Sequence, residues 1–115
     1  MPANAINLAN PEMHQVVLTT LPDLETAQRI ARCLVEGRLA ACVNLLPPMQ
    51  SVYQWQDKVE TATEVLLVIK TTADRYAALE NAILAQHPYD VPEIIALPIT
   101  NGLPSYLEWL KAETR

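Results

Sequence analysis

Glycine is nearly absent from this chain, which has only Gly37 and Gly102 among its 115 residues. Phosphate-binding loops place several glycine backbone N–H groups against a phosphate, and two isolated glycines exclude such a loop here. The sequence also contains no Gly-x-Ser-x-Gly nucleophile elbow. Because no familiar pattern that activates a nucleophile is present, we expect a protein that is not an enzyme.

Positive charge is scarce as well, since 8 Lys and Arg residues stand against 13 Asp and Glu residues, a formal net charge of −5. The basic residues are scattered from Arg29 to Arg115. Nucleic acids bind to a concentrated positive patch, so we expect no nucleic-acid partner. Apolar residues make up 50% of the chain and charged ones only 18%. This balance predicts that contact between subunits covers part of the apolar excess.

Long hydrophobic runs and cysteines are also few. No apolar run approaches the roughly 20 residues that span a membrane, and residues 1–11 lack the basic and apolar segments of a secretion signal. The two cysteines, Cys33 and Cys42, are too few for a disulfide framework, and each lies among apolar neighbours. We therefore expect buried, inert thiols in a cytoplasmic protein without membrane insertion.

The length of the chain fits one domain. Residues 1–12 carry three asparagines and two prolines without periodicity, which predicts a flexible tail before a single domain at 13–115. Apolar and β-branched runs predict strands at 16–20, 39–46, 51–56, 59–70 and 93–99. Helical periodicity predicts helices that begin near residues 21, 74 and 103, and the second of them must end before His87-Pro88.

The first predicted helix has recognisable signals at both ends. Thr20 is a candidate N-cap, and Pro22 and Asp23 suit the first turn. Gly37 is placed to end the helix with a positive φ. These signals bound a helix between residues 21 and 37.

The elements follow the order β-α-β-β-α-β with a C-terminal helix. Gln56-Asp57-Lys58 predicts the turn of an unusually long hairpin, and Pro47-Pro48 must bend or bulge the strand before it. Two β-α-β halves in this order predict an α+β, ferredoxin-like sandwich with its helices on one face of the sheet. The other face is then bare, and its apolar side chains predict that a partner covers it.

Five short motifs, in order along residues 15–112, resemble those of the CutA family of divalent-cation-tolerance proteins. The first two are Leu-Ala-Ala-Cys-Val-Asn at 39–44 and Ser-x-Tyr-x-Trp at 51–55, which is followed by Lys58 and Glu64. The other three are Lys-Thr at 70–71, His-Pro-Tyr-x-x-Pro-Glu at 87–93 and Tyr-Leu-x-Trp at 106–109. The resemblance implies a ferredoxin-like subunit in a PII-like homotrimer, with long strands donated across subunit boundaries.

The same resemblance implies a role in divalent-cation tolerance or homeostasis, especially toward copper, with no established reaction. An alternative is a PII-like regulatory module that binds a small metabolite or a partner protein in clefts between subunits. A third reading, an enzyme that uses His87 and Glu93 as an acid–base pair, finds little support because nothing in the sequence activates a nucleophile.

His87 is the metal ligand that the resemblance suggests. Some copper-binding members use a cysteine at the end of the first strand and a His-His pair, where this chain has Thr19 and Gln86-His87. Two of three ligands are thus missing, so copper(II) or another divalent cation is expected to bind weakly or between subunits. Alternatively, His87 is a turn histidine that is hydrogen-bonded near a subunit boundary.

A cleft between subunits is the second candidate site. Glu64, Glu93 and Lys70 could hold a hard cation with water, or form an ion-pair network that fixes the trimer. The aromatic residues could line the cleft for a ligand or anchor the subunit interface, and they are Tyr53, Trp55, Tyr89 and Trp109.

Overall fold

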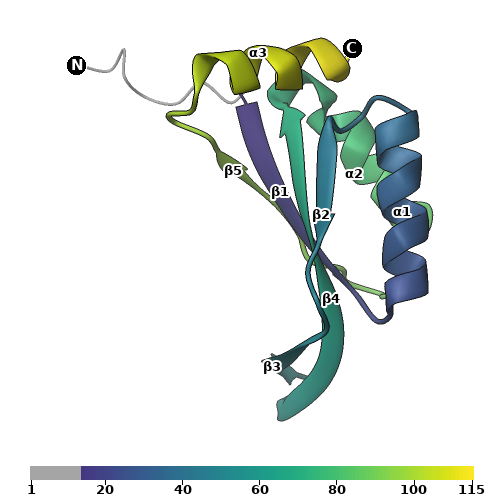
Figure 1. Cartoon of the computed structure of the whole chain (residues 1–115). Coiled ribbons are helices and arrows are strands. Elements are labelled where there is room, and N and C mark those ends of the chain that lie inside the picture. The colour runs from purple at the N-terminus through teal and green to yellow at the C-terminus, as the bar shows by residue number, and fades with distance from the viewer. Residues whose placement is uncertain (1–13) are drawn as a thin grey trace.

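We analysed the chain in a computed structural model that describes residues 14–115; the tail predicted at 1–12 lies outside the described residues. Five strands and three α-helices follow one another, with a short 3-10 helix at Ala73–Arg75 (Figure 1). The strands are β1 (His14–Leu21), β2 (Cys42–Leu45), β3 (Met49–Trp55), β4 (Lys58–Thr72) and β5 (Ile94–Pro98). The helices are α1 (Leu24–Glu36), α2 (Tyr76–Leu84) and α3 (Pro104–Glu113). The predicted α+β class is confirmed.

The sheet is built from two interleaved β-α-β units. Its strand order is β2-β4-β1-β5, and each neighbouring pair is antiparallel. The connection through α1 therefore crosses over β4, and the connection through α2 crosses over β1. Both helices lie on the same face of the sheet (Figure 1). Between the two layers is the core, whose fully buried members include Val17, Ile30, Leu34, Leu67, Ile69, Leu79 and Ile83.

The ends of α1 differ from the sequence-based expectation. The N-cap is Asp23, whose carboxylate accepts a 2.7 Å hydrogen bond from the Thr26 backbone N–H, and not Thr20, which still belongs to β1. Gly37 follows the helix with an ordinary φ of −82°, and the positive φ of 57° falls on Arg38. The correction has a physical reason: a carboxylate caps a helix as well as a hydroxyl does, and the chain reverses one residue later.

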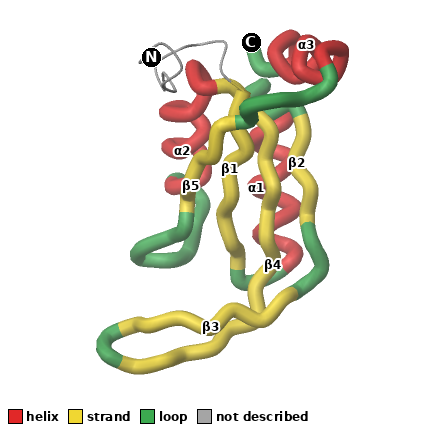
Figure 2. The backbone as a smooth tube through the Cα atoms, turned by 90° about the vertical axis from the view of Figure 1, so that its left-hand side faces the viewer, coloured by secondary structure: helices red, strands yellow, loops and turns green. Residues whose placement is uncertain are grey.

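The hairpin of β3 and β4 forms an arm that projects beyond the core. Residues 58–64 of β4 pair with β3, and residues 65–72 pair with β1 and β2. The strand predicted at 39–46 is shorter and spans Cys42–Leu45. It begins later because the N–H groups of Leu39 and Ala40 donate to the Leu34 carbonyl in the turn after α1, and Pro47 and Pro48 follow its end. In Figure 2 the arm turns sharply away from the sheet. Its side chains are largely exposed within one subunit, including Val52 and Val59 at 65% and 66%.

The tip of the arm carries local backbone strain. Gln56 and Asp57 both have positive φ, 51° and 65°, which is typical of the tight type I′ turns of hairpins. Asp57→Gly is expected to raise the free energy of unfolding by about 1 kcal/mol, because glycine adopts this conformation without strain. Urea denaturation measures the gain. Asp57→Asn removes the same charge but keeps a Cβ, so an equal gain in that variant would contradict the explanation by strain.

The face of the sheet opposite α1 and α2 is apolar and largely open. Side chains alternate along each strand, so those between the core positions point to this face. Leu18 lies at its centre, with Val68 of β4 and Ile95 of β5 directly opposite. We call this set the open face: Val16, Leu18, Leu66, Val68, Ile95 and Leu97. Helix α3 crosses the end of the sheet (Figure 1).

No helix in residues 14–115 is long and apolar enough to span a membrane.

Candidate functional site at the base of the arm

Three of the predicted site residues meet where the arm leaves the sheet. His87 and Tyr89 lie in the loop after α2, and Glu64 lies on β4 between the arm and the core. The Tyr89 hydroxyl donates a 2.8 Å hydrogen bond to Glu64 Oε2, and the rings of His87 and Tyr89 lie 4.8 Å apart. We call these three residues the base cluster.

The hydrogen bonds of His87 define the tautomer of its ring. The Tyr89 backbone N–H donates to Nδ1 at 3.2 Å, so Nδ1 must present its lone pair. Nε2 then carries the proton and donates to the Thr20 carbonyl at 2.8 Å. Both ring nitrogens of the neutral imidazole are therefore occupied. A metal ion at Nδ1 would have to displace the Tyr89 N–H, and the predicted role of His87 as a ligand stays a prediction.

The surroundings of the base cluster shift the pKa values of His87 and Tyr89. Burial lowers the pKa of His87 below its ordinary value of 6.5, against the smaller opposing effects of the Thr20 carbonyl and the Glu64 charge. Burial also raises the pKa of the Tyr89 hydroxyl well above its usual range, and the Glu64 carboxylate raises it further. At neutral pH the cluster thus holds a neutral imidazole and a neutral phenol.

The lowered pKa of His87 makes stability depend on pH. The unfolded chain binds a proton at this residue more readily, so the free energy of unfolding falls as pH drops through about 6.5 toward the lower folded-state pKa. Urea denaturation at pH 7.5 and 5.5 measures this loss. His87→Gln, which cannot titrate, should lose less stability over the same interval. An equal loss in both proteins would assign the acid sensitivity to other groups.

Glu64 is buried without an opposite charge. It is 8% exposed, and it is the only acidic or basic residue in the buried set of residues 14–115. Its hydrogen-bond partner is the neutral Tyr89 hydroxyl, and neither ion pair found in that range involves it. A buried carboxylate is costly unless it is paired, and neither ion pair in the described part of the subunit supplies a cation to Glu64.

Lys70 does not join Glu64 and Glu93 within the subunit. Six residues of extended strand separate Lys70 from Glu64, about 20 Å along β4. Lys70 instead donates through Nζ to Asn44 Oδ1. Glu93 precedes β5 and is exposed. It lies near the base cluster, because the next residue, Ile94, pairs with Thr19, and the neighbouring Thr20 carbonyl accepts a hydrogen bond from His87. The expected cluster of two carboxylates and one ammonium is therefore not formed in one subunit.

The aromatic residues divide between the two ends of the molecule. Tyr53 and Trp55 lie on the arm, 40% and 39% exposed, and Tyr53 is near enough to act electrostatically on Tyr89. Trp109 is exposed on α3, where its ring lies 5.6 Å from that of Tyr106. A single cleft that contains all four predicted aromatic residues would require more than one subunit.

The cysteines correct another expectation. Cys33 is exposed on α1, and Cys42 is half-buried on β2. Cys42 Sγ lies 4.0 Å from Lys70 Nζ, since the antiparallel register places the two residues opposite each other. Neither thiol is buried in an inert apolar environment. The strand pairing, which the sequence does not specify directly, brings this ammonium to the thiol.

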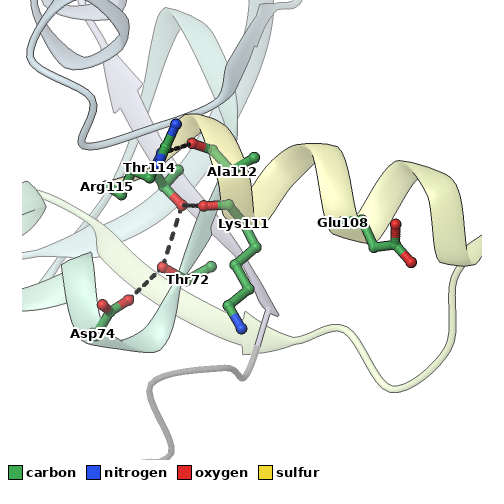
Figure 3. A pocket seen from close by; sticks show the side chains of 7 residues that line it. All are labelled: Thr72, Asp74, Glu108, Lys111, Ala112, Thr114 and Arg115. Carbon is green, nitrogen blue, oxygen red and sulfur yellow. Dashed lines mark hydrogen bonds between the residues drawn. The ribbon is translucent and has the colours of Figure 1, made fainter.

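A shallow groove lies between the end of α3 and the end of β4 (Figure 3). Thr72 Oγ1 donates to Asp74 Oδ1 at 2.5 Å and lies 3.5 Å from Thr114 Oγ1. Thr114 in turn contacts the carbonyls of Leu110 and Lys111 at 3.0 and 3.2 Å. These hydroxyls fasten the C-terminal helix to the sheet, which gives the groove a structural role.

Ligating residues do not gather elsewhere. In residues 14–115 no group of three or more His, Cys, Asp or Glu side chains is arranged to hold a metal ion. The sequence identified His87 and Tyr89 through the motif at 87–93, and Glu64 through the hairpin motif that begins at Ser51. It did not find the part played by the Thr20 carbonyl, because a backbone acceptor leaves no trace in side-chain identity.

The fold defines the class of the protein as an antiparallel α+β sandwich with a projecting hairpin arm. Residues 15–113 match the family model described as CutA1 divalent ion tolerance protein. The chain is 50% identical to the divalent-cation tolerance protein CutA of Thermus thermophilus over 102 residues, 89% of this chain and 99% of that protein. The chain therefore belongs to the CutA1 family, and several of its relatives are named divalent-cation tolerance proteins, a name that describes no reaction.

Solved structures agree with this assignment. The divalent cation tolerance protein from Thermus thermophilus superposes with a TM-score of 0.88 at 50% identity, covering 90% of this chain and 100% of that one. CutA1 from Oryza sativa gives 0.87 at 48% identity, covering 90% and 94%. The chloroplastic CutA of Arabidopsis thaliana is 49% identical over 87% of this chain, but the chain spans only 55% of that relative's length.

Proposed function

We propose that the protein acts in divalent-cation tolerance as a homotrimer, and that any cation site is completed between subunits. The family match supports the tolerance role, and the open face supports the assembly. Leu18, Val68 and Ile95 lie side by side on it, and α1 and α2 cover only the opposite face. A contiguous apolar surface of this kind is typical of a permanent interface.

The donor chemistry supports sharing between subunits. A tight copper or zinc site needs three or four ligands, and no such group exists within residues 14–115 of one subunit. His87 would offer Nδ1 once the Tyr89 N–H is displaced, and a neighbouring subunit would supply the remaining ligands. Copper(II) or another divalent cation would then bind weakly, and folding would not depend on it.

Light scattering and calorimetry test the two parts separately. Light scattering of the purified protein is expected to give three times the subunit mass, and a monomer would refute the trimer. Titration with copper(II), zinc and cadmium should give heat that is reduced in His87→Ala. A trimer that gives no heat at millimolar metal would refute direct binding. Stabilisation by one nucleotide or metabolite that persists in chelator would favour the alternative of a PII-like regulatory module.

A further inference from the structure

The unbalanced carboxylate of Glu64 indicates that a cation is supplied from outside the subunit. Glu64 is 8% exposed, and among the described residues its only hydrogen-bond donor is the neutral Tyr89 hydroxyl. A neutral hydroxyl satisfies a hydrogen-bond acceptor of the carboxylate but supplies no positive charge. A positively charged group that reaches Glu64 would therefore remove the cost of the buried charge.

Lys58 is the one cation in the described part of the chain that contacts no partner. Lys58 is the first residue of β4, beside the turn of the arm, and its side chain is exposed. Each of the other seven basic residues has a hydrogen bond or another interaction within the subunit; these residues are Arg29, Arg32, Arg38, Lys70, Arg75, Lys111 and Arg115. The subunit thus exposes one unpaired ammonium and buries one unpaired carboxylate.

These two charges cannot meet within one chain. They lie at opposite ends of the same half of β4, six residues or about 20 Å apart along an extended strand. Pairing with β3 keeps the strand extended from Lys58 to Glu64. The Lys58 ammonium that balances Glu64 would therefore come from a second copy of the chain.

The face of the arm that carries Lys58 is suited to docking. Directly opposed residues of an antiparallel pair share one face, so Trp55 and Tyr53 lie on the same side as Lys58. Both aromatic side chains are exposed in the subunit. Tyrosine and tryptophan are enriched among the residues that anchor interfaces. The loop beyond the base cluster offers a matching apolar contact in Val91, which is 71% exposed.

We propose that Lys58 at the arm tip of one copy binds Glu64 at the arm base of the next copy. This inference rests on the proposed trimer. Each copy then gives one arm and receives one, a heterologous contact that closes into a ring under threefold symmetry. The long lysine stem lies along apolar surface while its ammonium reaches the carboxylate. The ion pair and the hydroxyl of Tyr89 together balance Glu64.

A zero-length carbodiimide cross-linker tests the contact directly. It activates a carboxylate, and a nearby amine displaces the resulting urea to form an amide. Mixed trimers of 15N-labelled and unlabelled chains should yield a Lys58–Glu64 peptide that joins one labelled and one unlabelled partner. Lys58→Arg keeps the charge but forms no stable amide under these conditions, so it should lose this peptide and remain trimeric. A link within one chain, or none in a trimer, would overturn the proposal.

A double-mutant cycle supplies a second measurement. Lys58→Met and Glu64→Gln are each expected to weaken trimer association about 10- to 100-fold. The double variant should associate no more weakly than the single variant that has the larger loss. Additive losses would refute the pairing. Loss of trimer in wild-type protein on adding chelator would assign a metal ion to Glu64 instead. A wild-type monomer in light scattering would refute the trimer itself. A trimer without the Lys58–Glu64 link would refute only the contact.

Discussion

Leu18→Glu is expected to convert the trimer into folded monomers. Leu18 lies on β1 at the centre of the open face, and its neighbours Val68 and Ile95 offer no hydrogen bond through their side chains. In the single subunit Leu18 is half-buried, so a carboxylate there can still reach water. In an assembly that covers this face, each subunit would bury an unpaired charge, at a cost of at least about 3 kcal/mol.

That cost corresponds to more than about 100-fold weaker association for each subunit. Light scattering across a dilution series measures the change in mass, and circular dichroism verifies that the monomer is folded. Leu84→Glu is the matched control: Leu84 is 49% exposed at the end of α2, on the side of the sheet away from the open face. Its variant should remain trimeric. If Leu18→Glu stayed trimeric with unchanged affinity, the open face would not be the interface.

Two buried threonines are expected to respond in opposite directions to the same substitution. Thr71 is fully buried and donates through Oγ1 to the Leu39 carbonyl at 2.6 Å. Thr71→Val leaves that carbonyl without this donor and should lower the free energy of unfolding by about 1 to 3 kcal/mol. Thr19 is equally buried, but its hydroxyl has no hydrogen-bond partner. Thr19→Val should raise the free energy of unfolding by about 1 kcal/mol.

Denaturation at one fixed protein concentration measures both variants, because the stability of an oligomer depends on concentration. Each substitution replaces a hydroxyl with a methyl group of similar shape on the β1–β4 pair, so the two serve as controls for each other. The two midpoints should move apart in opposite directions. Losses of equal size in both variants would show that the Thr19 hydroxyl has a partner, such as an ordered water molecule.

The base cluster shows where sequence reasoning reached its limit. The motif at 87–93 identified His87 and Tyr89, and Glu64 followed from the hairpin motif. Lys70 came from the same kind of evidence, but it lies far from Glu64 because an extended strand separates residues by about 3.3 Å each. Sequence proximity along a strand is therefore a poor guide to contact. Pairing between strands decides it, as the approach of Lys70 to Cys42 shows.

Local chemistry set the elements of this protein. Apolar alternation placed the strands, Pro47 and Pro48 ended β2, and the spacing of apolar residues in α1 chose its buried face. The sequence by itself thus determined the α+β class, the long arm and the existence of an apolar face without helices. These features depend on side chains within a few residues of one another.

Only the tertiary structure decided which charges are balanced. Burial of Glu64, the occupied nitrogens of His87 and the isolation of Lys58 all follow from the path of the arm relative to the sheet. Each of these depends on distances between residues remote in the chain, and the energy of a charge depends on its surroundings more than on its own identity. For that physical reason the sequence could name Glu64 and His87, whereas only the fold could show that Glu64 lacks a cation.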